Sequence, residues 1–243
     1  MDTLYMVIPA YNEEANIETV VREWYPVIGH GSEQSRMVVI NDGSKDDTEK
    51  ILLGLTAEFP KLTVLTKPNG GHGDTLLFGY DYALKNGADY IFQTDSDGQT
   101  RPEEFETFWK HRKKYAMLIG HRKGRQDGAS RVFVTKTLKF VCLICFHVKV
   151  TDANTPFRIM KAEYLRKALP LIPEHYNLPN VIISVLYARM KYPVKYIPIT
   201  FRPRQGGVNS INMKKIFGIG RQALKDFRMI NRVIKKAEKE NHE

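Results

Sequence analysis

The feature that most constrains the fold is the alternation of short apolar segments with helical patterns in the first half of the chain. Strands that are apolar throughout, rather than alternating, are typical of a sheet covered on both faces. The sequence therefore predicts an α/β fold with a mostly parallel central sheet and helices on both faces. The predicted strands are 4–9, 37–41, 62–66, 90–94 and 116–120, and helices are predicted between them, including 12–25 and 75–87.

Polar residues follow four of the predicted strands, at the point where each strand ends. The segments read YNEE after the first strand, DGS after the second, NGGHGD after the third and DSDGQ after the fourth. The carboxyl ends of parallel strands lie along one edge of a sheet, and ligands of open α/β sheets bind there. One polar loop would mean little, but four in successive positions predict a single ligand site.

The segment DSDGQ places two carboxylates, Asp95 and Asp97, close enough to repel each other. On an extended segment both side chains face one side, and Gln99 repeats the spacing. Carboxylate and amide oxygens suit Mg²⁺ or Mn²⁺, and such an ion would neutralise a diphosphate leaving group. The alternative is a surface turn in which one acid caps the next helix. Thr100 and Glu103 also have capping-box spacing.

The other clusters offer groups for binding a nucleotide. Asp42 could accept hydrogen bonds from a base or ribose, Tyr11 could pack on a base, and Glu13 could contact ribose. Ordinary turns and helix caps explain the same residue types equally well. The glycines of 67–75 would let the backbone approach a ligand, yet their spacing matches neither the Walker nor the Rossmann phosphate-binding motif.

The chain of 243 residues carries a formal net charge of +10, which suggests an anionic partner, although a solvated basic surface explains the charge equally well. We find no helix-turn-helix, RNP or zinc-finger pattern for nucleic acid. The N-terminus has no signal-peptide pattern, and the longest apolar run, 140–146, is far shorter than the roughly 20 residues of a membrane span. We therefore expect a cytoplasmic protein, soluble or peripheral to a membrane.

Five segments together carry a resemblance to a known family: VIPAYNEEANI, VINDGSKDDT, NGGHGDTLLFGYDYAL, YIFQTDSDGQTRPEEF and DANTPFRIM. Over most of residues 4–205 the chain resembles the inverting glycosyltransferases of family two. Within them it looks most like the polyprenyl-phosphate (dolichol-phosphate) mannosyl- and glucosyltransferase branch, whose D-x-D-x-Q metal motif DSDGQ matches. The resemblance implies a GT-A fold, hexosyl transfer from a nucleotide-diphosphate sugar to a polyprenyl phosphate, and a Mn²⁺ or Mg²⁺ cofactor.

The resemblance also implies roles for individual residues. The metal ligands would be Asp97, Gln99 and Asp95. The nucleotide-sugar-binding residues would be Pro9, Tyr11, Glu13, Asp42, Gly71, Asp74, Asp95 and Arg202. The catalytic residues would be Asp152, Arg122 and Arg131, with the two arginines near the phosphates of the donor or the lipid acceptor. Pro156 stands where relatives carry glycine in a Gly-Phe-Arg-like string, which leaves the backbone near Asp152 open.

We divide the chain into a GT-A domain over 1–212 and a basic amphipathic C-terminal helix over 213–243. The domain would have a nucleotide-binding half, 1–120, and an acceptor half, 121–212, with helices predicted at 131–148 and 179–191 and a strand at 194–201.

The tail contains nine Lys or Arg against four Asp or Glu, a composition typical of a helix at an anionic membrane surface. Packing on the domain or on a partner explains its apolar stripe equally well. The stripe consists of Ile216, Ile219, Ala223, Phe227, Ile230 and Ile234.

Membrane access could come from the 131–148 helix, from the tail or from a separate membrane subunit, since the transmembrane helices of many relatives are not found here. A missing Gln-x-x-Arg-Trp motif argues against processive polymer synthesis.

The alternative function is the same donor chemistry on a soluble glycan, polyol or protein. More remote alternatives are a nucleotidyltransferase and a basic nucleic-acid-binding domain. Asp152 would be essential as a base only for a hydroxyl acceptor, because a phosphate acceptor is already ionised at neutral pH.

Overall fold

The computed structural model describes residues 1–122, 140–202 and 226–234. Its centre is a seven-stranded sheet in the order β3-β2-β1-β4-β6-β5-β7, in which β6 runs antiparallel to both of its neighbours and the other pairs are parallel. The predicted α/β fold with a mostly parallel sheet is therefore confirmed. The strands are β1 (Leu4–Ala10), β2 (Arg36–Asn41), β3 (Leu62–Thr66), β4 (Tyr90–Gln93), β5 (Met117–Arg122), β6 (Arg158–Lys161) and β7 (Val194–Ile199).

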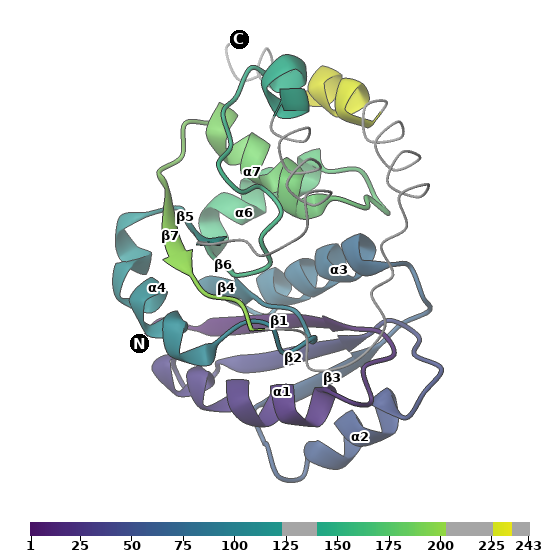
Figure 1. The fold of residues 1–243 in the computed structure, drawn as a ribbon. Coiled ribbons are helices and arrows are strands. Elements are labelled where there is room, and N and C mark those ends of the chain that lie inside the picture. Colours follow the sequence, from purple (N-terminus) through teal and green to yellow (C-terminus); the bar gives the residue numbers. More distant parts are fainter. Residues whose placement is uncertain (123–139, 203–225, 235–243) are drawn as a thin grey trace.

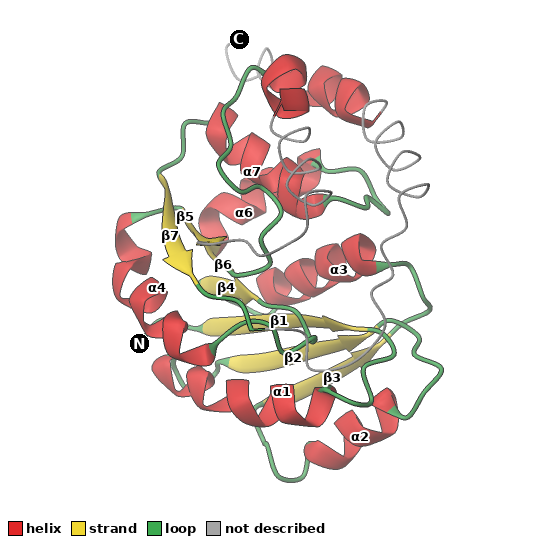
Figure 2. Cartoon of the chain, in the orientation of Figure 1, coloured by secondary structure: helices red, strands yellow, loops and turns green. Residues whose placement is uncertain are grey.

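Helices cover both faces of the sheet (Figure 1; Figure 2). The α-helices are α1 (Ile17–Trp24), α2 (Thr48–Leu55), α3 (His72–Lys85), α4 (Phe105–His111), α6 (Ala162–Ala168) and α7 (Pro179–Arg189). Shorter 3-10 helices are η1 (Tyr25–His30), η2 (Pro102–Glu104), η3 (Arg112–Lys114) and η4 (Leu169–Leu171). None of the helices in the described ranges is long and apolar enough to cross a bilayer.

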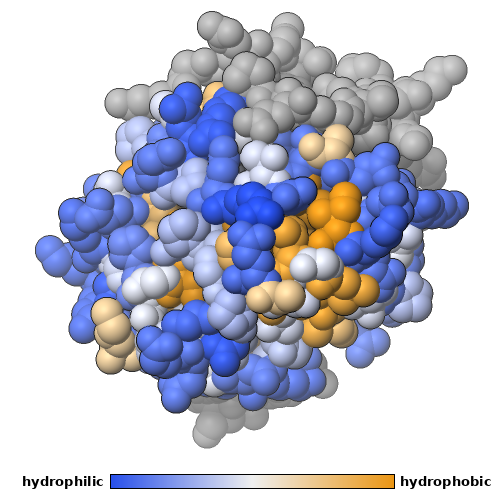
Figure 3. All heavy atoms as spheres, turned by 90° about the horizontal axis from the view of Figure 1, so that it is seen from below, coloured by the Kyte–Doolittle hydropathy of each residue, from blue (hydrophilic) through white to orange (hydrophobic). Residues whose placement is uncertain are grey.

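Alternating residues of the central strand β1 supply the two halves of the core. Tyr5 and Val7 pack into the cluster under α3, α6 and α7, whereas Met6 and Ile8 pack into the cluster formed with α1, α2 and α4. Because both faces of β1 are buried, every residue of the strand is buried. The outer face below α1 and α2 is mostly hydrophilic, with hydrophobic side chains gathered in smaller areas (Figure 3).

The predicted capping box at Thr100 and Glu103 is wrong. The hydroxyl of Thr100 is buried and lies 2.6 Å from that of Thr94, so it is used inside the fold and caps nothing. A 3-10 turn, η2, precedes the α-helix, which begins only at Phe105. The buried hydroxyl pair therefore competes with the local capping pattern and replaces it.

The tail is described over 226–234, which is helical. The described members of the predicted stripe, Phe227, Ile230 and Ile234, are buried in the core cluster, and Phe227 meets the ring of Phe146 with centroids 5.1 Å apart. These three residues therefore pack on the domain itself and not on a membrane. Ile216, Ile219 and Ala223 lie outside the described residues. Of the predicted 131–148 helix, residues 140–146 are described and helical.

Gly79 brings α3 close to the sheet and gives a test of this packing. A Cβ at this position would lie 2.5 Å from Val7 Cγ1 and 2.9 Å from Ile40 Cδ1, both in the buried strands. We expect Gly79→Ala to lower the free energy of unfolding by about 1–3 kcal/mol, because overpacking outweighs the better helix propensity of alanine. Urea unfolding measures the change.

The matched control is Gly54→Ala in α2, where a Cβ would meet nothing within 4 Å. Here only the propensity gain of up to about 1 kcal/mol remains, so this variant should be as stable as the wild type or more so. A Gly79→Ala protein that matches Gly54→Ala in stability would contradict the close packing of α3.

Candidate active site

A pocket of about 400 Å³ lies at the carboxyl edge of the parallel strands. The loops that follow β1, β2, β3 and β4 all contribute to its wall, as the four polar clusters of the sequence predict. Its lining consists of Pro9, Ala10, Tyr11, Glu13, Asp42, Asn69, Gly71, His72, Thr75, Asp95, Ser96 and Asp97. Seven of the predicted site residues therefore meet here: Pro9, Tyr11, Glu13, Asp42, Gly71, Asp95 and Asp97.

The segment after β4 turns its acidic side chains toward the pocket. Asp95, Asp97 and Gln99 are partly exposed, whereas the residues between and after them are buried. Asp95 and Asp97 line the pocket, and Gln99 is not among its lining residues. Asp95 Oδ1 is buried without a hydrogen-bond partner, and His72 Nε2 lies 3.9 Å from it. A buried carboxylate oxygen with no donor is expensive unless a cation compensates it.

These residues fit a divalent cation. Asp97 Oδ1 accepts a hydrogen bond from the backbone of Gln99, and Gln99 Nε2 donates to Arg202 O, which fixes the short segment between them. Within the described ranges no group of three or more His, Cys, Asp or Glu side chains could hold a metal. A cation here would therefore rest on two carboxylates and an amide, and phosphate oxygens would complete its shell, as Mg²⁺ sites often do.

Asp42 organises the glycine-rich loop after β3. Its Oδ1 accepts hydrogen bonds from Lys67 Nζ (2.6 Å) and Gly70 N (2.9 Å), and its Oδ2 accepts one from Gly71 N (2.9 Å). Gly71 has φ +86°, a conformation that suits glycine, and it ends the loop at the start of α3. A carboxylate that accepts several donors holds its loop in one shape, so Asp42 shapes the pocket wall through this loop.

Lys67 joins Asp42 to Asp74. Its ammonium lies 2.9 Å from Asp74 Oδ2, and the side chain is largely buried. Burial opposes the charge on Lys67, but the hydrogen bonds with the two carboxylates raise its pKa above the usual value. Burial likewise opposes ionisation of Asp74, yet Lys67 and His175 together lower the pKa of that carboxyl. Both shifts favour the charged forms, so Lys67 and Asp74 stay ionised together beside the pocket.

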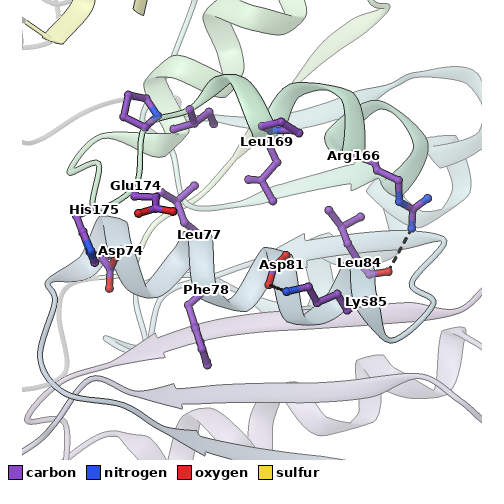
Figure 4. Close-up of a pocket in the computed structure, with 13 residues that line it drawn as sticks. Asp74, Leu77, Phe78, Asp81, Leu84, Lys85, Arg166, Leu169, Glu174 and His175 are labelled. Carbon is purple, nitrogen blue, oxygen red and sulfur yellow. Dashed lines mark hydrogen bonds and ion pairs between the residues drawn. The ribbon is translucent and has the colours of Figure 1, made fainter.

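Asp74 does not line this pocket at the carboxyl edge of the sheet, although the sequence analysis predicts it among the nucleotide-sugar-binding residues. It lies at one end of a second cavity, of about 900 Å³, between α3 and the segment after α6. His175 Nδ1 and Asp74 Oδ1 are 2.7 Å apart there and point toward one another (Figure 4). At the other end, Arg166 donates to Leu84 O.

Tyr11 and Glu13 differ in how free they are to meet a ligand. Tyr11 is 43% exposed and lines the pocket, so it is accessible from solvent. Glu13 is buried. Its Oε2 accepts a hydrogen bond from Asn16 Nδ2 at 2.7 Å, and its backbone N–H donates to Thr48 Oγ1. Glu13 thus ties the loop after β1 to the start of α2.

Asp152 reaches the site region through β6. Because β6 is antiparallel to β4, its first residue, Arg158, pairs with Gln93, the last residue of β4. The segment that carries the buried Asp152 therefore arrives at the same edge of the sheet. Asp152 is not among the residues that line the pocket at this edge.

Arg158 holds that segment in place. Its guanidinium is fully buried and donates to Ala153 O (2.9 Å), Thr155 O (2.8 Å) and Asn180 O (3.0 Å). Burial lowers the pKa of Arg158, and the nearby Asp152 carboxylate is among the groups that oppose this shift. Since its hydrogen-bond partners among the described residues are neutral, Arg158 fixes the backbone around Asp152 without pairing with an acid.

Only part of the predicted set of arginines lies within the described residues. Arg122 ends β5, where its backbone pairs with Ile199, and Arg131 lies outside the described residues. The guanidinium of Arg202 forms two 3.0 Å hydrogen bonds with Glu23 of α1. The backbone N–H of Arg202, however, donates to Gln99 O, so the backbone of Arg202 lies beside the predicted metal-binding segment.

Sequence reasoning missed Lys67, Arg158 and His175. Lys67 comes directly after β3, in the position where the other strands carry their polar clusters, and this placement could have revealed it. Arg158 stands inside a quoted motif, but only the fold shows that it is buried. His175 is 101 residues from Asp74, and no local pattern links the two.

Comparison with known proteins agrees with this geometry. The model of the family described as "Glycosyl transferase family 2" matches residues 5–169, more than half of the chain. The site and fold define an α/β protein with an acidic pocket at the carboxyl edge of its sheet. The chain belongs to glycosyl transferase family 2.

The named relatives include lipid-phosphate sugar transferases. A dolichyl-phosphate beta-glucosyltransferase of Trichomonas vaginalis is 29% identical over 184 residues, 68% of this chain and 53% of the relative. A polyprenol monophosphomannose synthase of Mycolicibacterium smegmatis is 26% identical over 220 residues, 87% of this chain and 82% of the relative. The chain spans about half the length of the Trichomonas relative and of a second dolichyl-phosphate beta-glucosyltransferase from the same organism.

Solved structures show the same fold. Glucosyl-3-phosphoglycerate synthase from Mycobacterium tuberculosis, in complex with Mn²⁺, uridine diphosphate and phosphoglyceric acid, superposes with a TM-score of 0.69. It shares 19% sequence identity, and the match covers 95% of this chain and 78% of that one. The predicted GT-A fold is therefore confirmed, while the predicted C-terminal amphipathic helix is not tested by this likeness.

The ionised group around Lys67 predicts a pH-dependent effect of Lys67→Met. A carboxyl whose pKa is lowered on folding, as for Asp74, adds stability that is present above about pH 4 and is lost as pH falls through the folded-state value. We expect Lys67→Met to lower the free energy of unfolding by about 1–3 kcal/mol at pH 7, since two carboxylates lose their partner. The loss should shrink below pH 4.

Denaturant unfolding between pH 7 and acid conditions measures this difference. Lys61→Met is the matched control, because Lys61 pairs with Glu33, which is 96% exposed, and surface pairs contribute little. A Lys67→Met effect that is as small as the control at pH 7, or that stays constant with pH, would contradict the ionised group.

Proposed function

We propose that this chain is a metal-dependent inverting glycosyltransferase that moves a hexose from a UDP- or GDP-linked sugar to a polyprenyl phosphate. The observation that carries the proposal is the convergence of four strand-end loops on one pocket, with Asp95 and Asp97 in its wall. Family membership supports the reaction class, and the names of the relatives support a lipid phosphate as the acceptor.

The nucleotide would lie against the loops after β1, β2 and β3. The exposed ring of Tyr11 would stack on the base. Both carboxylate oxygens of Asp42 already accept hydrogen bonds, so Asp42 would act on the base mainly through the loop that it holds. Gly71, in that loop, would bring the backbone close to the nucleotide.

The diphosphate would lie against the segment after β4. Asp97, Gln99 and Asp95 would hold Mn²⁺ or Mg²⁺, which supplies positive charge to the leaving diphosphate when bound. Arg122 and Arg131 would donate to phosphate oxygens, for which the guanidinium fork is well suited. These groups would stabilise the charge that develops on the nucleoside diphosphate.

Transfer would be a single displacement at the anomeric carbon. An acceptor oxygen forms a bond to this carbon from the face opposite the diphosphate. The bond between carbon and diphosphate oxygen breaks, and the nucleoside diphosphate leaves with the electron pair. The configuration of the sugar inverts. A phosphate acceptor needs no base for this step, whereas a sugar hydroxyl would need one, and Asp152 is the residue we assign to that role.

A lipid acceptor would place the protein in the cytoplasm at the inner face of a membrane, as a peripheral protein or with a separate membrane subunit. Nucleic acid has no part in this function. The second candidate is the same transfer to a soluble glycan, polyol or protein, and the buried Asp152 is the observation that favours it.

The test is transfer of labelled sugar from UDP- and GDP-sugars to polyprenyl phosphate with Mn²⁺, followed by analysis of the linkage. We expect an inverted glycosyl phosphate from the wild type and a loss of at least about 100-fold in kcat/KM for Asp97→Asn, because removing one group that stabilises a leaving-group charge costs this much. Asp81→Asn is the control and should keep the rate, because Asp81 lines the second cavity, pairs with Lys85 and is not part of the pocket that Asp97 lines.

Asp152→Asn separates the two acceptors. With a phosphate acceptor its rate should fall less than about tenfold, and with a hydroxyl acceptor by about 100- to 10,000-fold. Product that forms only on soluble hydroxyl acceptors would replace the lipid proposal with the second candidate. Release of pyrophosphate in place of a nucleoside diphosphate would contradict both.

A further inference from the structure

The helix of residues 140–146 exposes an apolar face. Phe140 is 61% exposed, Leu143 is 42% exposed and Ile144 is 57% exposed, and their spacing places them on one side of the helix. Cys142 and Phe146 on the other side are buried. An ordinary surface helix turns charged or polar residues outward, so this helix has apolar residues on both sides.

The tail helix of residues 226–234 packs beside it and also exposes apolar side chains. Asn231 Nδ2 donates to Cys145 O at 2.9 Å, and the rings of Phe227 and Phe146 are in contact. The two helices also lie next to one another at one end of the molecule (Figure 1). Met229 is 50% exposed and Val233 is 41% exposed.

Two arginines accompany these apolar side chains. Arg228 and Arg232 are exposed on the tail helix, each next to one of its exposed apolar residues in the sequence. We use the term docking face for the seven exposed residues of the two helices. The docking face consists of Phe140, Leu143, Ile144, Arg228, Met229, Arg232 and Val233.

The docking face is the main concentration of exposed apolar side chains in the described part of the chain. Five of the nine exposed large hydrophobic residues there belong to these two short helices. The other four lie outside these two helices, and one of them, Tyr11, lines the pocket at the carboxyl edge of the sheet. Exposed apolar residues that scatter singly need no explanation, whereas a contiguous group next to positive charge indicates a binding surface.

We propose that the docking face binds the surface of an anionic lipid bilayer. Phe, Leu, Ile, Met and Val side chains would enter the boundary between headgroups and acyl chains, while Arg228 and Arg232 would remain at the level of the lipid phosphates. This inference rests on the proposed lipid acceptor for its purpose, and it names the residues that would bring the enzyme to that acceptor.

Charge argues against a second copy of the chain as the occupant. In a two-fold interface the same face meets itself, so Arg228 and Arg232 of both copies would lie close together. Like charges in a closing interface oppose association, whereas anionic headgroups neutralise them. The docking face therefore suits a lipid surface better than its own duplicate.

Vesicle sedimentation tests the proposal with the full chain. The probes are phosphatidylcholine vesicles with and without phosphatidylserine, and the variants are Phe140→Ser/Ile144→Ser and Arg228→Gln/Arg232→Gln. We expect the wild type to bind the anionic vesicles, with weaker binding at high salt. Each double variant should bind at least about tenfold more weakly, since one basic residue at such a surface contributes roughly fivefold.

Leu53→Ser is the matched control, because Leu53 is 55% exposed on α2, away from the docking face. It should bind vesicles like the wild type, and all variants should unfold at wild-type denaturant concentrations. Double variants that bind as well as Leu53→Ser would overturn the proposal. A concentration-dependent dimer in sedimentation velocity, lost in the double variants, would do the same and would assign the face to a second copy.

A second readout separates this proposal from the proposed function. Transfer to a short-chain, water-soluble isoprenyl phosphate needs the donor site but no bilayer, so the double variants should keep it. Wild-type binding to vesicles without any transfer would contradict the proposed function and leave the docking face standing. Transfer to the soluble acceptor by a wild-type protein that does not bind vesicles would support the proposed function and contradict the docking face.

Discussion

The parallel pairing of β1 with both β2 and β4 is the constraint on which the site depends. Ala10 pairs with Asn41, so the loops after β1 and β2 begin side by side. Val7 pairs with Gln93, so β4 ends beside β1 and its acidic segment enters the same edge. Backbone hydrogen bonds thus bring together pocket residues that are 88 positions apart, from Pro9 to Asp97, before any side chain contributes.

The charges of the site follow from this arrangement. A chain with a net charge of +10 collects Asp42, Asp95 and Asp97 in one pocket wall. One of these acids is compensated by Lys67 and by backbone amides, and Asp95 Oδ1 is left without a donor. The sheet therefore presents one acid that is already neutralised and another whose charge suits a cation. This difference separates a structural carboxylate from a ligand-binding one.

The sequence was sufficient for the sheet and for the convergence of its loops, because both depend on local signals: apolar strands, and polar residues where strands end. It was not sufficient where a distant partner decides. The hydroxyl of Thr100 pairs with Thr94 inside the fold, which removes the predicted cap. Arg202 is close to Gln99 through its backbone, yet its guanidinium binds Glu23, 179 residues away in the sequence.

The tail illustrates the same limit. Its apolar stripe predicted either a membrane face or a packing face, and periodicity alone could not separate them. In the fold Phe227, Ile230 and Ile234 face inward. The outward side of that helix is mixed, with Arg228 and Met229 adjacent. It indicates a binding surface only when it is considered together with the exposed apolar residues of helix 140–146. A surface made by two helices far apart in the sequence leaves no pattern within either of them.

The central claim is that the pocket binds a nucleoside diphosphate through a metal held by the segment after β4. Calorimetric titration of UDP and GDP into the protein, with Mn²⁺ and then with a chelator, tests it most directly. We expect one nucleotide to bind with Mn²⁺, and we expect the chelator and Asp97→Ala each to weaken binding at least about tenfold, because a cation would bridge carboxylate and phosphate. Binding of neither nucleotide to the folded protein, or equal binding with and without the metal, would contradict the account.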